Sequence, residues 1–195
     1  TDIHGSDICW SKFHNAGKFY GADKLILGGD ITGKAVIPFV HQGGKNYRIT
    51  LLEQVFEPAN DEELADMVKR VRSRGYYPYM TNPDEIAELE KDPERVSEIF
   101  LQEVLKVVQQ WMDLADKKLE GTDMKVYCSP GNDDMDEVDD IIRSSRRVLL
   151  VEGQVTQLDD HHEMIASGWS NRTPWDTHRE EDEDQLKVRY EAMTS

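Results

Sequence analysis

Apolar residues recur at the helical period of 3.6 in several stretches of the chain. Residues 7–20 form the first stretch, and Gly21 follows it as a stop signal. The longest stretch runs from about Pro93 to Leu119 and keeps one broad apolar face. The pattern predicts helices at 7–20, at 61–73, after Asn82-Pro83, at 93–119, through Val138 and Ile142, and in a charged last segment that reaches Tyr190.

Short apolar blocks bounded by Gly, Pro, Asn or Asp predict strands instead. They occupy residues 24–29, 35–40, 47–55, 125–128, 148–151 and 164–166. Strands that alternate with helices are typical of a parallel sheet with crossover connections. We therefore expect an α/β fold in a single domain over residues 1–195, with an insertion at 35–120 that contains helices.

The charge and composition of the chain argue against several classes of function. The chain has 195 residues and a formal net charge of −16, which argues against a surface that wraps nucleic acid or binds an anionic membrane. No apolar run approaches the roughly 18 residues that indicate a membrane span. The two cysteines, Cys9 and Cys128, lack the spacing of a metal site, which favours a cytoplasmic location. A negatively charged substrate then needs a local attraction, such as bound divalent metals.

Three loops combine small residues with side chains that bind metals. They are Asp2-x-His4, Gly28-Gly29-Asp30 and Gly131-Asn132-Asp133-Asp134. The second and third follow predicted strands, and the first has the composition of a loop that follows one. Loops at the carboxyl ends of parallel strands meet at one edge of a sheet. A carboxylate and an imidazole can then share one cation, one carboxylate can bridge two, and an amide oxygen can bind the second. The glycines allow close backbone approach.

In order, Asp2-x-His4, Gly29-Asp30 and Gly131-Asn132-x-Asp134 resemble the first three motifs of the calcineurin-like metallophosphoesterases. The resemblance covers roughly residues 1–155. It implies a four-layer α/β/β/α sandwich and a binuclear centre of Mn, Fe or Zn ions. It also implies that Asp2 and His4 bind one ion, Asp30 bridges both, and Asn132 binds the other. The implied activity is hydrolysis of a small phosphomonoester or phosphodiester by metal-bound hydroxide.

The sequence departs from this family at two places. Asp133 stands where the family usually has a histidine that assists the leaving group, so it is the candidate catalytic residue. An ionised Asp133 repels phosphate and cannot donate a proton, which predicts slow turnover unless its pKa is raised or another residue supplies the proton. The family also has a further histidine and a Gly-His-x-His motif, whereas only His161, His162 and His178 follow Asn132. We interpret the chain as incomplete at both ends.

Other interpretations stay open. The chain can be a binding or scaffold protein that keeps the fold with a degraded site, and Asp133 favours this alternative. Asn132 can be only the N-cap of the helix through Val138. Lys34 and Arg172 are candidate substrate contacts, because either cation can bind a phosphate. We expect His161-His162 in an exposed hairpin turn and His178 on the surface. The sequence does not indicate an oligomeric state.

Overall fold

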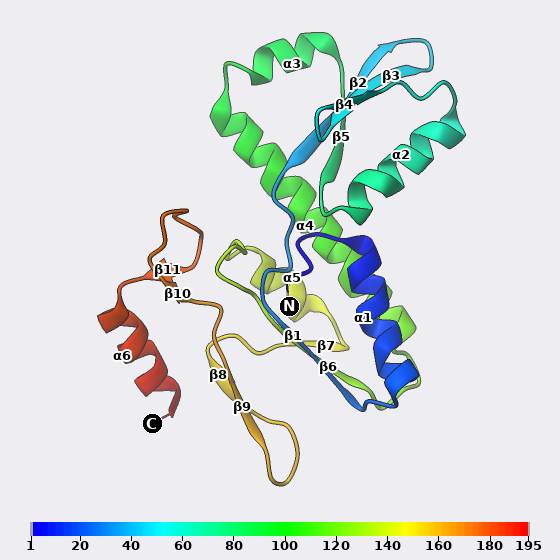
Figure 1. The fold of residues 1–195 in the computed structure, drawn as a ribbon. Coiled ribbons are helices and arrows are strands. Elements are labelled where there is room, and N and C mark those ends of the chain that lie inside the picture. Colours follow the sequence, from blue (N-terminus) through cyan, green and yellow to red (C-terminus); the bar gives the residue numbers. More distant parts are fainter. Residues whose placement is uncertain (1, 195) are drawn as a thin grey trace. The chain divides into compact units, whose positions relative to one another are not determined.

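The computed structural model describes residues 2–194 and shows an α/β protein (Figure 1). The described chain forms two compact units. The first contains residues 2–3, 10–32 and 108–194, and the second contains residues 4–9 and 33–107. Each unit has a sheet and helices of its own.

A parallel sheet of three strands lies in the first unit. Its order is β1 (Lys24–Gly28), β6 (Lys125–Ser129) and β7 (Val148–Leu150). The registers of β1 and β6 match from Lys24 with Lys125 to Gly28 with Ser129, so both strands end at the same level. The chain segments that follow β1 and β6 therefore leave the sheet side by side (Figure 1).

Helices pack against one another and the sheet in the first unit. They are α1 (Asp7–Tyr20), which belongs to this unit from Trp10 onward, α4 (Pro93–Lys118), which belongs to it from Val108 onward, and α5 (Val138–Ser144). The rings of Trp10 and Trp111 stack with centroids 5.1 Å apart. Both side chains are buried with Leu25, Leu27, Val126 and Val148 of the sheet.

The rest of the first unit follows β7. The strands β8 (Gln154–Gln157) and β9 (Glu163–Ala166) form an antiparallel hairpin. The short strands β10 (Ser170–Asn171) and β11 (Glu180–Glu181) pair in parallel, and α6 (Glu183–Thr194) follows. His161 and His162 are exposed in the β8–β9 turn, and His178 is also exposed, as the sequence predicts.

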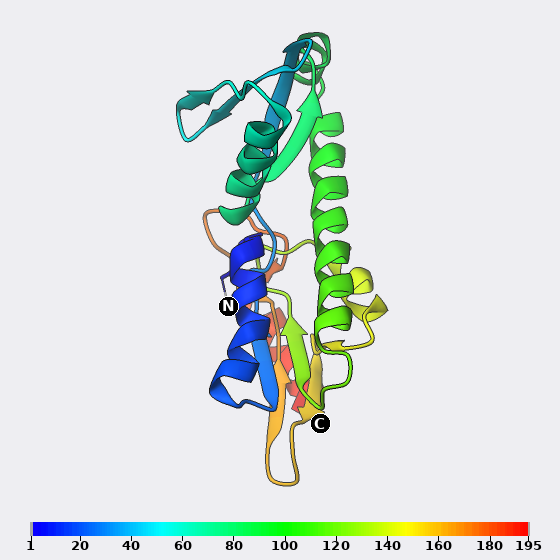
Figure 2. The ribbon, with the colours of Figure 1, turned by 90° about the vertical axis from the view of Figure 1, so that its right-hand side faces the viewer.

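A mixed four-stranded sheet forms the second unit, in the order β4-β3-β2-β5. Its strands are β2 (Val36–Gly43), β3 (Asn46–Leu51), β4 (Gln54–Phe56) and β5 (Tyr77–Thr81). A buried cluster of Phe39, Ile49, Leu51, Met67 and Val71 joins the sheet to α2 (Asp61–Ser73). Figure 2 shows β5 between α2 and the first turns of α4. The short helix α3 (Pro83–Leu89) has no buried residue.

Most predicted elements are confirmed, including helices at residues 7–20 and 61–73. The strand prediction over 47–55 is wrong, and the sequence does not predict β5, β8, β10 or β11. The strand expected over 47–55 is interrupted, because Leu52 and Glu53 have positive φ angles and form the turn between β3 and β4.

None of the helices within residues 2–194 is long and apolar enough to cross a membrane.

Candidate metal site

The loops after β1 and β6 contain Asp30 and Asn132, two of the four predicted metal ligands. Because the two strands are adjacent and parallel, their carboxyl ends place these loops next to each other. The first loop joins them through Asp2, whose backbone N–H donates a hydrogen bond to Gly29 O at 3.1 Å.

Two of the predicted ligands lie close together in the first unit. Asp2 and Asp30 each offer a carboxylate oxygen, and these atoms lie within 4.8 Å of each other. His4 follows Asp2 by two positions in the sequence and belongs to the second unit. Two carboxylate oxygens at this separation suit one divalent metal, which binds such atoms at about 2.0–2.2 Å. The residues present therefore fit a metal ion.

The backbone at three of the predicted ligands is strained. The φ angles of Asp2, His4 and Asp30 are 55°, 39° and 50°. Residues other than glycine rarely adopt such angles, which are found preferentially at functional sites. Six described residues other than glycine have a positive φ angle, and three of them are predicted metal ligands.

Two glycines allow the second and third loops to approach closely. A Cβ atom on Gly131 would lie 2.1 Å from Asp30 Oδ1 and 2.3 Å from Asp30 N. A Cβ atom on Gly29, whose φ is 94°, would lie 2.9 Å from Gly131 Cα. Any larger residue at position 131 would displace the Asp30 carboxylate, so glycine at this position is required by the geometry of the site.

Asp134 connects the same two loops from below the surface. Its carboxylate is fully buried and accepts hydrogen bonds from Gly131 N at 2.7 Å, Ile31 N at 3.1 Å and Thr32 N at 2.8 Å. The Thr32 hydroxyl adds a fourth at 2.7 Å. Asp134 thus holds the backbone on both sides of the predicted ligands, a role that we did not assign to it from the sequence.

The amide of Asn132 has a defined orientation. Its Nδ2 lies 2.9 Å from Thr177 Oγ1, and that hydroxyl donates its proton to Glu180 Oε1 at 2.6 Å. A hydroxyl that already donates can only accept from Asn132, so the amide nitrogen faces Thr177. Among the described residues, no donor binds Asn132 Oδ1, which leaves this oxygen for a ligand. Asn132 does not cap the following helix, because α5 has its N-cap at Glu137.

Two further residues that we did not identify from the sequence support this arrangement. Hydrogen bonds from Thr173 and Thr177 lower the pKa of Glu180 to about 2, so this carboxylate stays ionised as an acceptor. Arg179 is only 1% exposed. Its Nε donates to Asp134 O at 2.9 Å and its Nη2 to Met135 O at 3.1 Å. The segment between β10 and β11 therefore anchors the loop that contains Asn132.

A cavity of about 410 Å³ lies within the first unit beside this loop. Asp30 and Asn132 both line it. Its other walls come from the ends of β1 and β6 and from residues 164–170. Its lining residues are Ile26, Gly28, Gly29, Asp30, Ser129, Pro130, Gly131, Asn132, Val151, Met164, Ile165, Ala166, Ser167, Gly168, Trp169 and Ser170. Two predicted ligands thus border one space large enough for a small substrate.

Glu152 fixes one wall of this cavity. Its Oε2 accepts from Gly168 N at 2.6 Å and from the Ser129 hydroxyl at 3.2 Å. Burial raises the pKa of the Glu152 carboxyl, and the Gly168 hydrogen bond opposes this effect. The carboxyl therefore joins residues 167–169 to the end of β6.

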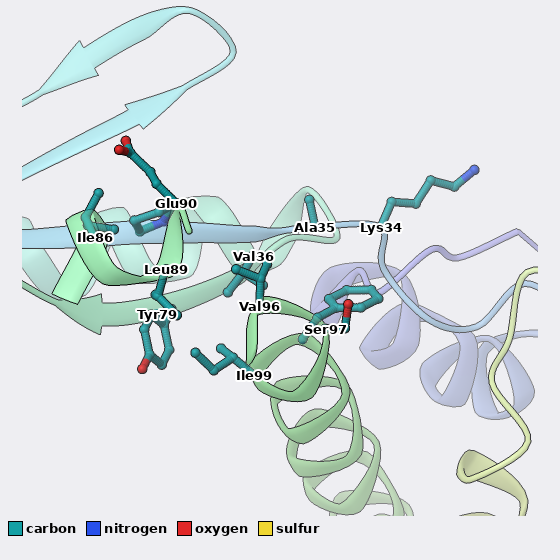
Figure 3. Close-up of a pocket in the computed structure, with 12 residues that line it drawn as sticks. Lys34, Ala35, Val36, Tyr79, Ile86, Leu89, Glu90, Val96, Ser97 and Ile99 are labelled. Carbon is teal, nitrogen blue, oxygen red and sulfur yellow. The ribbon is translucent and has the colours of Figure 1, made fainter. Parts of the chain in front are cut away.

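The remaining predicted site residues are placed differently. The backbone N–H of Asp133 donates to Asp30 Oδ1 at 3.4 Å, so Asp133 adjoins the Asp30 loop. Arg172 is exposed, pairs with Asp182 at 2.7 Å and is not among the described residues that line the cavity. Lys34 borders a separate, largely apolar cavity of about 540 Å³ within the second unit. Figure 3 shows its side chain pointing away from the apolar residues there.

Comparison with known proteins gives no relative for this chain. No protein-family model, no curated protein and no solved structure matches it. The site is therefore interpreted from its own residues.

Proposed function

We propose that this chain is a metal-dependent phosphoesterase that hydrolyses a small phosphomonoester or phosphodiester. In this proposal Asp2, His4 and Asp30 bind one cation, and Asp30 and Asn132 bind a second. The fold is proposed to be the four-layer α/β/β/α sandwich of the calcineurin-like metallophosphoesterases. The observation that carries the proposal is the separation of at most 4.8 Å between the Asp2 and Asp30 carboxylate oxygens within the first unit.

Metal ions of this kind polarise a phosphoryl oxygen and lower the pKa of water. The other residues of the site hold the proposed ligands in position. Asp134 holds both loops, Gly131 allows Asp30 to approach the third loop, and Thr177 aims the Asn132 amide. In the proposal Asp30 is the shared ligand because it lies close to Asp2 and also lines the cavity with Asn132.

Asp133 limits the proposed reaction. Its backbone N–H donates to Asp30 Oδ1, so residue 133 adjoins the proposed site, where a negative charge would repel a phosphate. A leaving group that departs without a proton avoids the need for an acid. Aryl esters are therefore the preferred test substrates.

The test combines metal titration with hydrolysis of bis(4-nitrophenyl) phosphate. We expect Mn²⁺ to bind in calorimetry and to support hydrolysis. Asp30→Asn should weaken binding at least tenfold and abolish hydrolysis, because it removes the shared carboxylate. The control is Asp160→Asn in the exposed β8–β9 turn, which should change neither. Equal Mn²⁺ affinity in wild-type and Asp30→Asn protein would contradict the proposed site.

A second candidate function is a binding or scaffold protein with a degraded site, and Asp133 is the observation that favours it. Asp133→His separates the two candidates. In an enzyme this change adds an imidazole beside the site, and hydrolysis should rise by about tenfold or more. In a scaffold both the wild type and Asp133→His should be inert with Mn²⁺ present.

A further inference from the structure

Trp169 borders the same cavity as Asp30 and Asn132. Its indole is covered on one face by Arg189, whose guanidinium carbon lies 4.1 Å from the ring centroid. A molecule in the cavity can therefore contact only the other face or the edge of the ring. Trp169 follows the β8–β9 hairpin and directly precedes β10, so it belongs to the first unit, as Asp30 and Asn132 do (Figure 1).

Other contacts hold the indole in place. Arg189 Nε and Nη2 bind Glu181 Oε1 and Oε2 at 2.5 and 2.9 Å. This two-point pair fixes the plane of the guanidinium, because both groups are planar. The backbone N–H of Trp169 donates to Ser167 Oγ at 3.3 Å. We call Trp169, Arg189 and Glu181 the Trp169 platform. Its geometry is set before any ligand binds, which reduces the entropy lost on binding.

The cavity offers apolar surface to the organic part of a ligand beside its polar groups. Ile26, Met164 and Ile165 line it together with Trp169. Among the described lining residues, Asp30 is the only one with a charged side chain. Stacking and apolar contact can therefore attract a substrate body, and metal binding at Asp30 would account for the phosphate end.

We propose that the substrate is a phosphate ester with a planar aromatic group, and that this group stacks on the Trp169 platform. The phosphate half of this inference rests on the proposed phosphoesterase function, whereas the aromatic half rests on Trp169 alone. A flat ring gains affinity from stacking on an aromatic side chain. A saturated ester group of similar charge gains less at this surface.

The first experiment compares two phosphonates that cannot be hydrolysed as phosphate esters. Phenylphosphonate and methylphosphonate are titrated into Mn²⁺-loaded protein by calorimetry. We expect phenylphosphonate to bind about tenfold more tightly, since stacking contributes only to its affinity. Trp169→Leu should remove this preference, because it lowers the affinity for phenylphosphonate about tenfold more than the affinity for methylphosphonate. Trp169→Phe should keep most of the preference.

Trp175→Leu is the matched control, because Trp175 is 80% exposed and is not among the lining residues. It should keep the wild-type preference. A preference for phenylphosphonate that persists in Trp169→Leu would overturn the inference, as would equal binding of the two phosphonates to wild-type protein.

A second experiment separates this inference from the metal site. Saturation transfer from protein to benzyl alcohol, which has no phosphate, is measured for wild type, Asp30→Asn and Trp169→Leu. A loss of transfer in Trp169→Leu that is larger than any change in Asp30→Asn supports the platform even if Mn²⁺ titration fails. Equal transfer in wild type and Trp169→Leu overturns the platform even if Mn²⁺ binds as proposed.

Discussion

A few residues of the candidate site combine a strained backbone conformation with close contacts to neighbouring loops. Asp2, His4 and Asp30 hold positive φ angles, which cost of order 1 kcal/mol or more for each residue other than glycine. Their neighbours impose this conformation. Asp2 N is bound to Gly29 O, and Asp30 lies against Gly131. The strain orients side chains rather than stabilising the fold, as expected of a binding site.

Gly131→Ala tests this close approach. The new Cβ would lie 2.1 Å from Asp30 Oδ1, so the two loops must separate. We expect unfolding by denaturant to show a loss of about 1–3 kcal/mol of stability. Mn²⁺ affinity should fall as well, because Asp30 shifts.

Gly28→Ala is the control for this change, since a Cβ there meets nothing within 4 Å. Its stability should stay within about 0.5 kcal/mol of wild type. A Gly131→Ala protein as stable as Gly28→Ala would show that the loops do not pack as described.

The sequence predicts candidate ligands but not the residues that support them. Asp30 and Asn132 can be predicted because each follows an apolar strand in a short motif. Asp134 belongs to the same motif, yet its partners Ile31 and Thr32 are more than 100 residues away. Arg179 lies in a polar stretch typical of a surface turn, although it is buried. Only the folded chain brings such partners together.

At the scale of elements, local signals explain what was predicted correctly. The helix α2 begins at the N-cap Asn60, whose side chain accepts from Glu63 N, and Gly75 follows its end. The strand β5 (Tyr77–Thr81) has no such signal. It contains Pro78, a residue that argues against a strand because it has no backbone N–H to donate. Its partner β2 is parallel to it and distant in sequence. Periodicity alone therefore does not reveal it.

The turn after β7 contains a carboxyl group, Glu152, with a testable pH dependence. Burial raises its pKa above the ordinary value of 4.5. Its stabilising contribution is therefore complete below about pH 4.5 and is lost as the pH rises through the folded-state pKa. Glu152→Gln stays neutral, so its stability relative to wild type should increase with pH over this window.

Unfolding by urea at about pH 4.5, 6 and 7.5 measures this difference. Glu163→Gln, at an exposed position of β9, is the control and should show no such trend. A constant difference between Glu152→Gln and wild type across the three pH values would argue against a raised pKa.

At the scale of the whole molecule, the excess of acidic residues acts on both proposed ligands. The chain has 39 acidic and 23 basic residues, which gives the net charge of −16. Such a charge attracts divalent cations and repels phosphate esters. The cavity lining within the first unit adds no basic side chain. In the proposed enzyme, metal binding would therefore precede the binding of an anionic substrate.

The electrostatic attraction from this net negative charge predicts that Mn²⁺ affinity depends on the salt concentration. The screening length falls from about 30 Å at 0.01 M to about 8 Å at 0.15 M ionic strength, so distant carboxylates stop contributing. We expect the Mn²⁺ dissociation constant from calorimetry to rise several-fold over this range. Tetramethylammonium chloride should act like potassium chloride, because screening depends on ionic strength and not on a cation that enters the site. Sucrose at matched osmolality should have no effect. An affinity independent of salt would mean that the proposed ligands alone set metal binding, without the rest of the acidic surface.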